Sequence, residues 1–157
     1  MLRVGVIGAG KWGSNHIRVF QELQSEGMCE LIGFSDRDRD KKWAFGCQYY
    51  ESYKELLKFV DAVSIAVPTD MHYEVVKDCL LAGKHVLVEK PITLNSEEAG
   101  ELIKISEREN LILASGYIYR FNPAVLNLKE RMSEFGTIHN ITMRYIHSHK
   151  PPRRDSG

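Results

Sequence analysis

Three glycines close to the N-terminus have the spacing of a phosphate-binding turn. Gly8, Gly10 and Gly13 follow the apolar run 4–7, which is typical of a buried parallel strand. Gly8 permits a tight turn, Gly10 lets the backbone approach a phosphate, and Gly13 lets the following helix pack closely on the strand. The N–H groups at the start of that helix attract an anion. The pattern predicts a dinucleotide pyrophosphate site, but glycine turns are common, so this prediction needs support from the rest of the chain.

An acidic residue after the next predicted strand supports this interpretation. Asp36 lies about 20 residues past Gly13, the spacing at which a carboxylate accepts hydrogen bonds from the adenosine ribose. A carboxylate there repels a 2′-phosphate and therefore favours NAD over NADP. Arg37 follows directly and could tolerate that phosphate or stack on adenine, so NADP stays possible. The alternative is that Asp36 only caps the polar turn 36–40.

Lys90 is the strongest candidate for chemistry. It belongs to the triplet Glu89-Lys90-Pro91, directly after a predicted strand. Ligands of open α/β sheets bind at the carboxyl ends of the strands, where a lysine beside a cofactor can orient a hydroxyl or share its proton. Without that context, an ordinary surface lysine is the better interpretation. His72 follows the preceding strand and could contact substrate or cofactor, or simply lie in the first turn of its helix.

Strands and helices alternate up to residue 115. The apolar pattern predicts strands over 2–7, 29–35, 48–50, 62–67, 85–88 and 111–115. It predicts helices over 12–24, 40–45, 52–57, 69–81 and 96–109. Thr69 or Asp70 is expected to cap the fourth helix, and His16 is interpreted as a structural residue of the first. This alternation predicts a doubly wound parallel sheet with right-handed crossovers, and the candidate residues above lie at one of its edges.

The pattern changes after the sixth strand. A helix is expected to open at 119–123, with Pro123 in its first turn, and to end at Gly136. Residues 137–148 alternate and predict the first strand of another sheet, for which the sequence contains no partner. We therefore expect a dinucleotide-binding domain over 1–120. Over 121–157 we expect a linker helix and the start of an incomplete second α/β domain, unless the strand 137–148 pairs with another chain in a homo-oligomer.

The composition argues against several other classes of function. The 157 residues carry a formal net charge of zero, which gives no electrostatic case for nucleic acid or an anionic membrane. No apolar run has the length of a membrane span, and the first strand begins too early for a signal peptide. Cys29, Cys47 and Cys79 lack metal-ligand spacing, so we expect no metal site. Free thiols indicate a reducing cytoplasm.

Together these motifs resemble one family of oxidoreductases. The motifs are Gly8-Ala9-Gly10-Lys11-Trp12-Gly13-x-x-His16, Asp36, Pro68-Thr69-x-x-His72, Glu89-Lys90-Pro91 and Arg120-Phe121-Asn122-Pro123. The combination resembles the glucose–fructose oxidoreductase, inositol dehydrogenase and MocA family, of which the Glu-Lys-Pro triplet is the most specific mark. The resemblance covers essentially the whole chain. The tail 151–157 is similar to the approach to the substrate motif in members that oxidise nucleotide-linked sugars.

The resemblance implies an NAD(P)-dependent oxidoreductase that acts on a hydroxyl of a sugar, a sugar derivative or a cyclitol. The residues implied to hold the pyrophosphate are Gly8, Gly10, Lys11, Trp12 and Gly13. Those implied to meet the adenosine ribose are Asp36 and Arg37, and those implied to line the cofactor cleft are Thr69 and His72. At the nicotinamide end the resemblance implies Glu89 on the ribose, Lys90 beside the reacting hydroxyl, and Arg120 and Asn122 nearby.

The length of the sequence departs from the family pattern. Family members are considerably longer and add a C-terminal α/β domain with an Asp-x-x-x-His motif, whose histidine acts with the lysine in proton transfer. This sequence stops before that motif, so we expect a truncated chain that binds NAD or NADP but turns over poorly. Two alternatives stay open: a Rossmann sensor or partner module without catalysis, and a methyltransferase, which would leave the Glu-Lys-Pro triplet unexplained.

Overall fold

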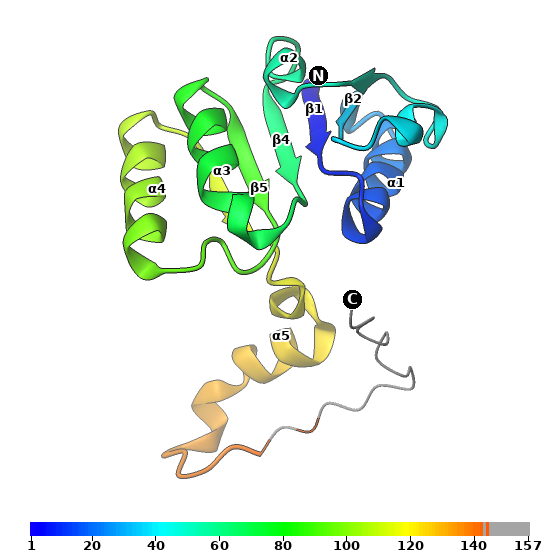
Figure 1. The fold of residues 1–157 in the computed structure, drawn as a ribbon. Helices are drawn as coiled ribbons and strands as arrows, with labels where there is room; N and C mark the ends of the chain where they lie inside the picture. The colour runs from blue at the N-terminus through cyan, green and yellow to red at the C-terminus, as the bar shows by residue number, and fades with distance from the viewer. Residues whose placement is uncertain (143, 145–157) are drawn as a thin grey trace, which may run out of the picture. The chain divides into compact units, whose positions relative to one another are not determined.

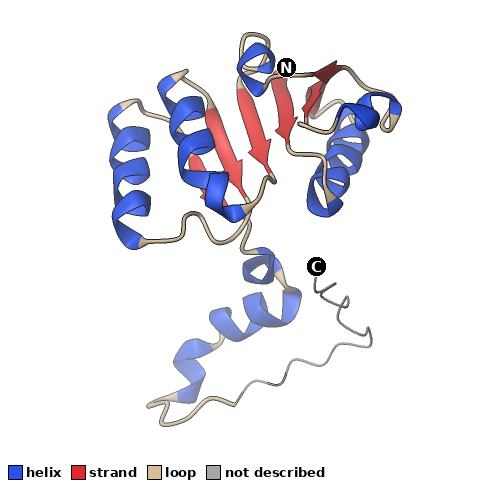
Figure 2. Cartoon of the chain, in the orientation of Figure 1, coloured by secondary structure: helices blue, strands red, loops and turns tan. Residues whose placement is uncertain are grey.

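A six-stranded parallel sheet forms the centre of the N-terminal region (Figure 1; Figure 2). The computed structural model describes residues 1–142 and 144. The strands are β1 (Leu2–Ile7), β2 (Cys29–Ser35), β3 (Tyr49–Tyr50), β4 (Ala62–Ile65), β5 (His85–Val88) and β6 (Leu113–Ser115). The α-helices are α1 (Lys11–Ser25), α2 (Tyr53–Leu56), α3 (His72–Leu81), α4 (Ser96–Arg108) and α5 (Pro123–Glu130). The prediction of a doubly wound parallel sheet is confirmed.

The strand order β3-β2-β1-β4-β5-β6 creates a switch point beside β1. The chain builds from β1 out to β3, returns to place β4 on the other side of β1, and then continues to β6. Ile7 at the end of β1 is level with Ser35 of β2 and with Ile65 of β4. The carboxyl ends of these three strands therefore lie side by side, at the position where open α/β sheets bind ligands.

Two apolar clusters cover the two faces of the sheet. Successive side chains of a strand point to opposite faces, so Val6 and Ile7 of β1 belong to different clusters. Val6 packs with Ile17 of α1 and with Phe34 of β2. Ile7 belongs to the larger cluster, which includes buried residues of α2, α3 and α4. Helix α1 therefore covers one face, while α2, α3 and α4 cover the other.

Two of the predicted α-helices differ in the structure. One is a 3₁₀ helix over its whole length, and the other begins with a 3₁₀ turn. The helix expected over 40–45 is a 3₁₀ helix over Arg39–Trp43, opened by the Asp38 side chain, which accepts a hydrogen bond from the Asp40 N–H. Such local side-chain bonds compete with α-helix formation. The helix expected from Thr69 begins with a 3₁₀ turn over Thr69–Met71, and α3 starts only at His72. Met71 is the N-cap without a side-chain bond, so the expected cap by Thr69 or Asp70 is wrong.

The contacts divide the chain into two units at Tyr117. In the second unit the expected continuous helix to Gly136 is wrong, because α5 ends at Glu130 and a 3₁₀ helix, Met132–Phe135, follows. In that segment Arg131 pairs with Glu134 three residues later, the spacing that a 3₁₀ turn brings into line. Pro123 occupies the first turn of α5 as expected, where its missing N–H is not needed.

The strand predicted over 137–148 is absent from its described part. Residues 137–142 and 144 contain no strand. A strand is defined by hydrogen bonds to a neighbouring strand, and the described residues supply no such neighbour to this segment. The other residues of 137–148, and the tail, lie outside the described residues. Within residues 1–142 and 144, no helix has the length and apolar character needed to cross a membrane.

Candidate functional site

The glycine turn leaves β1 at the switch point and leads into α1. Gly8 has a φ of +88°, and a Cβ there would lie 2.7 Å from the carbonyl oxygen of Ala66. A Cβ on Gly13 would lie 1.8 Å from the carbonyl oxygen of Gly8, so α1 can pack on the turn only without a side chain. Gly10 has open space around its missing Cβ, with no atom within 4 Å. Two glycines thus allow the turn to close, and the third leaves room beside the backbone.

The start of α1 offers uncapped N–H groups beside that open space. Gly10 is the N-cap and supplies no side-chain acceptor, and the first turn contains no acidic residue. The first N–H groups of a helix need external acceptors and carry a partial positive charge. Lys11 and Trp12, which begin the helix, are exposed. The local sequence therefore leaves this helix end suited to an anionic ligand.

Asp36 connects the glycine turn to the loop after β2. Its Oδ2 accepts hydrogen bonds from the N–H of Ala9 at 2.6 Å and from Nζ of Lys41 at 3.1 Å, and its Oδ1 accepts from the N–H of Asp38 at 2.9 Å. Burial alone would raise the pKa of this carboxyl, but the three donors outweigh burial and hold the pKa below its usual range. Asp36 is therefore an anion that also braces the glycine turn.

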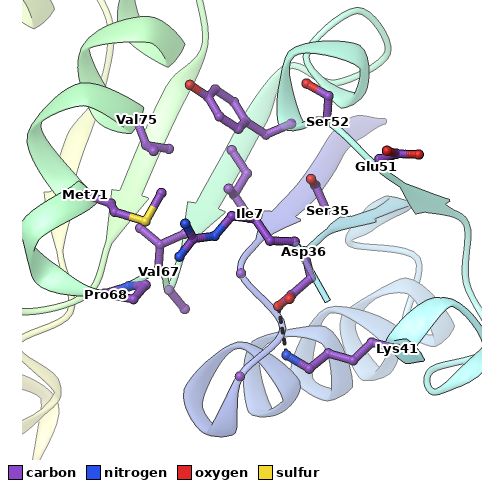
Figure 3. Close-up of a pocket in the computed structure, with 15 residues that line it drawn as sticks. Ile7, Ser35, Asp36, Lys41, Glu51, Ser52, Val67, Pro68, Met71 and Val75 are labelled. Carbon is purple, nitrogen blue, oxygen red and sulfur yellow. Dashed lines mark hydrogen bonds and ion pairs between the residues drawn. The ribbon is translucent and has the colours of Figure 1, made fainter. Parts of the chain in front are cut away.

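A cavity of about 420 Å³ lies between the glycine turn and the segment after β4. Figure 3 shows Asp36 and Lys41 joined on one side of this cavity, with Val67, Met71 and Val75 on the other. Arg37 and Lys41 both line the cavity, so two cations accompany the Asp36 carboxylate there. The combination of an apolar wall and a polar wall suits a purine with its ribose.

A smaller cavity of about 140 Å³ is also lined by the segment 66–68. Both cavities are lined by Ala66, Val67 and Pro68, which therefore form a shared wall. The other residues that line the smaller cavity are Trp12, Thr69, His72, Glu89 and Lys90. The structure thus brings together five residues that the sequence assigns to the cofactor.

Lys90 is exposed at the rim of the smaller cavity, directly after Glu89. Among the described residues its Nζ has no hydrogen-bond or ion-pair partner, unlike the paired Lys41. An ammonium at a cavity rim that is free of protein partners is able to contact a ligand hydroxyl. The peptide bond between Lys90 and Pro91 is cis.

His72 is buried and faces the backbone on both sides of its ring. Nδ1 lies 2.7 Å from the carbonyl oxygen of Pro91, and Nε2 lies 3.0 Å from the carbonyl oxygen of Val67. The side chain thereby joins the segment after β4 to the segment after β5. Of the two roles left open by the sequence, this geometry favours a structural one, although the ring also contributes to the cavity wall.

Arg120 and Asn122 lie in the second unit. Asn122 caps α5, because its side chain accepts a hydrogen bond from the Ala124 N–H at 2.9 Å. Arg120 is exposed in the 3₁₀ helix Ile118–Phe121. Their predicted approach to the nicotinamide end stays a prediction.

The arrangement of the site parallels that of a dinucleotide. Two cavities flank one shared wall, and an uncapped helix start with a side-chain-free approach lies beside the glycine turn. A dinucleotide has the same plan, with two nucleosides joined by a doubly charged linker. In the described part of the chain, no cluster of His, Cys, Asp and Glu could hold a metal ion.

This fold and this site define a dinucleotide-binding Rossmann domain. The chain belongs to the GFO/IDH/MocA family, described as an oxidoreductase family with an NAD-binding Rossmann fold, whose family model matches residues 2–117. The resemblance stated from the sequence motifs is thus confirmed.

Two relatives illustrate the range of the family. The chain is 34% identical to a UDP-N-acetylglucosamine 3-dehydrogenase of Acidithiobacillus ferrooxidans, over 98% of this chain and 48% of the relative. It is 32% identical to a myo-inositol 2-dehydrogenase of Thermotoga maritima, over 96% of this chain and 46% of the relative. The chain therefore spans about half the length of these relatives.

Solved structures give the same assignment. The UDP-N-acetylglucosamine 3-dehydrogenase of Acidithiobacillus ferrooxidans superposes with a TM-score of 0.75 at 37% identity, over 82% of this chain and 42% of that one. A 3-ketoreductase of Actinomadura kijaniata, solved with NADP and TDP-benzene, superposes with a TM-score of 0.74 at 30% identity, over 85% of this chain and 42% of that one.

Three polar residues at the site were not singled out from the sequence as site residues. Lys41 pairs with Asp36, while His16 contacts both Ser64 and Glu89. The sequence alone predicts a structural role for His16, and the one signal of a role at the site is its place three residues after Gly13 in the family motif. Ser64 lies within an apolar strand and carries no sequence signal of its own.

Proposed function

We propose that this chain is the NAD(P)-binding part of an oxidoreductase that transfers a hydride between nicotinamide and a hydroxyl of a sugar, a sugar derivative or a cyclitol. The observation that carries this proposal is the pair of cavities that share the lining residues 66–68, with Asp36 lining one and Lys90 the other. The sugar and cyclitol substrates named for the relatives support the substrate class.

In this proposal each end of the site has its own task. The uncapped start of α1 binds the pyrophosphate, and Asp36 accepts a hydrogen bond from the adenosine ribose. The nicotinamide, when bound, supplies the carbon that accepts or donates the hydride. Lys90 orients the reacting hydroxyl through its ammonium and shares the proton that leaves or returns with the hydride. Glu89 contacts the nicotinamide ribose from the wall of the smaller cavity.

We expect NAD to be the preferred cofactor and NADP to be accepted more weakly. Asp36 is an anion and therefore disfavours a 2′-phosphate, whereas Arg37 and Lys41 line the same cavity and moderate that repulsion. We also propose a cytoplasmic location, which the three free cysteines support. Association through 137–148 stays a prediction, since the described part of that segment contains no strand.

Calorimetric titration of the chain with NADH and NADPH tests the proposal. A folded sample should bind NADH more tightly than NADPH, and S-adenosylmethionine should not bind. A folded sample that binds neither dinucleotide would overturn the proposal.

A second test separates catalysis from binding. We expect the chain alone to reduce NAD slowly or not at all with UDP-N-acetylglucosamine or myo-inositol, because it spans about half the length of its relatives. In any form of the protein that turns over substrate, Lys90→Met should lower kcat by about 10²- to 10⁴-fold and leave the NADH affinity almost unchanged. An unchanged kcat would favour the alternative of a sensor without catalysis.

A further inference from the structure

His16 forms a bridge between two strands near the smaller cavity. Its Nδ1 lies 2.6 Å from Oγ of Ser64, a fully buried residue of β4. Its Nε2 lies 2.9 Å from Oε1 of Glu89, which directly follows β5. The side chains of His16 and Glu89 are only 16% and 14% exposed, so water competes weakly for these bonds.

The Glu89 carboxylate is restrained on its other sides as well. Its Oε2 lies 3.3 Å from the N–H of Lys90. A Cβ on Gly116 would lie 3.3 Å from the carboxylate, so the bare backbone of Gly116 closes another side. His16 is the one side chain of the described residues that donates a hydrogen bond to this carboxylate. The direction in which Glu89 faces the cavity therefore depends on His16.

Ser64 makes this arrangement tolerant of a change in charge. A hydroxyl is both a donor and an acceptor. It can donate to Nδ1 of a neutral imidazole, or accept from Nδ1–H of an imidazolium, while Nε2–H donates to Glu89 in both cases. His72 differs, because both of its ring nitrogens face carbonyl oxygens, which only accept. The bridge through His16 thus holds Glu89 in either state of the ring.

We propose that His16, oriented by Ser64, is a positioning residue that fixes the Glu89 carboxylate for the nicotinamide half of the dinucleotide. This inference rests on the proposed function, since it assigns Glu89 to the nicotinamide ribose. It predicts a weaker affinity for the nicotinamide half of the ligand only, because Glu89 lines the smaller cavity and does not line the cavity assigned to adenosine.

The test compares two ligands on the full chain. NADH probes both halves of the site, and ADP probes only the adenosine and pyrophosphate half. Removing a charge-assisted hydrogen bond in His16→Leu should weaken NADH binding about tenfold or more, and should leave ADP binding within about threefold of the wild type. The fluorescence of the bound nicotinamide should change in the same variant, which a loss of stability alone would not cause.

Two further variants address the mechanism. His16→Gln keeps an N–H donor near Glu89 and should restore most of the NADH affinity. Ser64→Ala removes only the hydroxyl. It should lower the affinity for NADH about threefold and leave the affinity for ADP unchanged. In a double-mutant cycle, His16→Leu should have little further effect on NADH binding once Glu89→Ala is present, because each of the two changes removes the hydrogen bond between these side chains.

His85→Leu serves as the matched control. The His85 ring lies at the opposite end of β5 and accepts a hydrogen bond from the Ile112 N–H. His85→Leu should therefore lower stability without lowering the affinity for NADH more than that for ADP. The inference would be overturned if folded His16→Leu lost affinity for NADH and ADP equally. It would also be overturned if neither His16→Leu nor Ser64→Ala lost affinity for NADH. If His16→Leu does not fold, Ser64→Ala decides, by whether its loss of affinity is confined to NADH. If the wild type binds neither ligand, the proposed function fails first, and this inference fails with it.

Discussion

Single polar residues at this site each serve two neighbouring segments. Asp36 joins the glycine turn to the loop after β2, and His16 joins β4 to the end of β5. The spacing of the glycines and of Asp36 was visible in the sequence because those residues act through local backbone geometry. The partners of His16 lie 48 and 73 residues away, and no pattern within one segment could reveal them.

The glycine turn allows a sharp comparison between two substitutions. Gly13→Ala should cost at least about 3 kcal/mol of unfolding free energy or prevent folding, since its Cβ would overlap the Gly8 carbonyl oxygen. Gly10→Ala should change stability by less than about 1 kcal/mol, because no protein atom lies within 4 Å of the added Cβ.

The same Gly10→Ala variant should bind NADH at least about tenfold more weakly, because the methyl group occupies the approach to the pyrophosphate. Urea denaturation and calorimetric titration measure the two effects separately. Unchanged NADH binding in Gly10→Ala would contradict the assignment of this turn to the phosphates.

Asp36 should make the unfolding free energy decrease as the pH falls into the acid range. The pKa of its carboxyl is lowered in the folded state, so its contribution is complete above the pKa of the unfolded chain and is lost as the pH falls through the folded pKa. Asp36→Asn should cost about 1–3 kcal/mol near neutral pH, and this difference should shrink as the pH falls through the folded pKa. Urea denaturation across this range measures it, with the exposed Asp40→Asn as control. A difference independent of pH would contradict the ionised bridge.

At the level of elements, the strands were easier to predict than the segments between them. The bounds of β1, β2 and β5 agree with the apolar pattern, but β4 and β6 are each two residues shorter than predicted. Val67 is apolar like the strand before it, yet it lines the cavities instead of pairing. An apolar pattern reports burial and cannot show where backbone pairing ends, which explains the overestimate.

The two segments that line the smaller cavity should loosen together when His72 is replaced. His72→Leu removes the ring that lies within hydrogen-bond distance of the carbonyl groups of Val67 and Pro91, and it should cost about 2–4 kcal/mol of unfolding free energy. Amide hydrogen exchange should become faster both near 67–71 and near 91–93. Tyr73→Phe is the control on the same helix, α3. It removes the hydrogen bond to Glu101 of α4 and should leave the exchange rates of both segments unchanged. Faster exchange in only one segment would contradict the bridge.

At the level of the whole molecule, both apolar clusters lie within the first unit. Their buried members run from Val6 to Ile105, and the family model ends at residue 117, where the two units divide. The doubly wound sheet was predictable from the alternation of strands and helices. The break after α5 was not predictable, because the apolar pattern runs on to residue 135 without a proline or glycine.

A chain that ends at Tyr117 should therefore fold by itself. Its unfolding free energy should lie within about 1 kcal/mol of that of the 157-residue chain, because every buried residue of the two clusters is retained. Circular dichroism during urea denaturation measures this, and calorimetry should give a similar NADH affinity. Loss of cooperative unfolding would show that the second unit contributes to the core.

The sheet ends on both sides in its shortest strands. β3 has two residues and β6 has three, so each edge exposes only a few unpaired backbone groups to a neighbouring molecule. Fibre growth by strand addition needs long, flat edges that can template one another. In a crowded solution, the two short edges therefore give this sheet a low tendency to form amyloid-like polymers by strand addition.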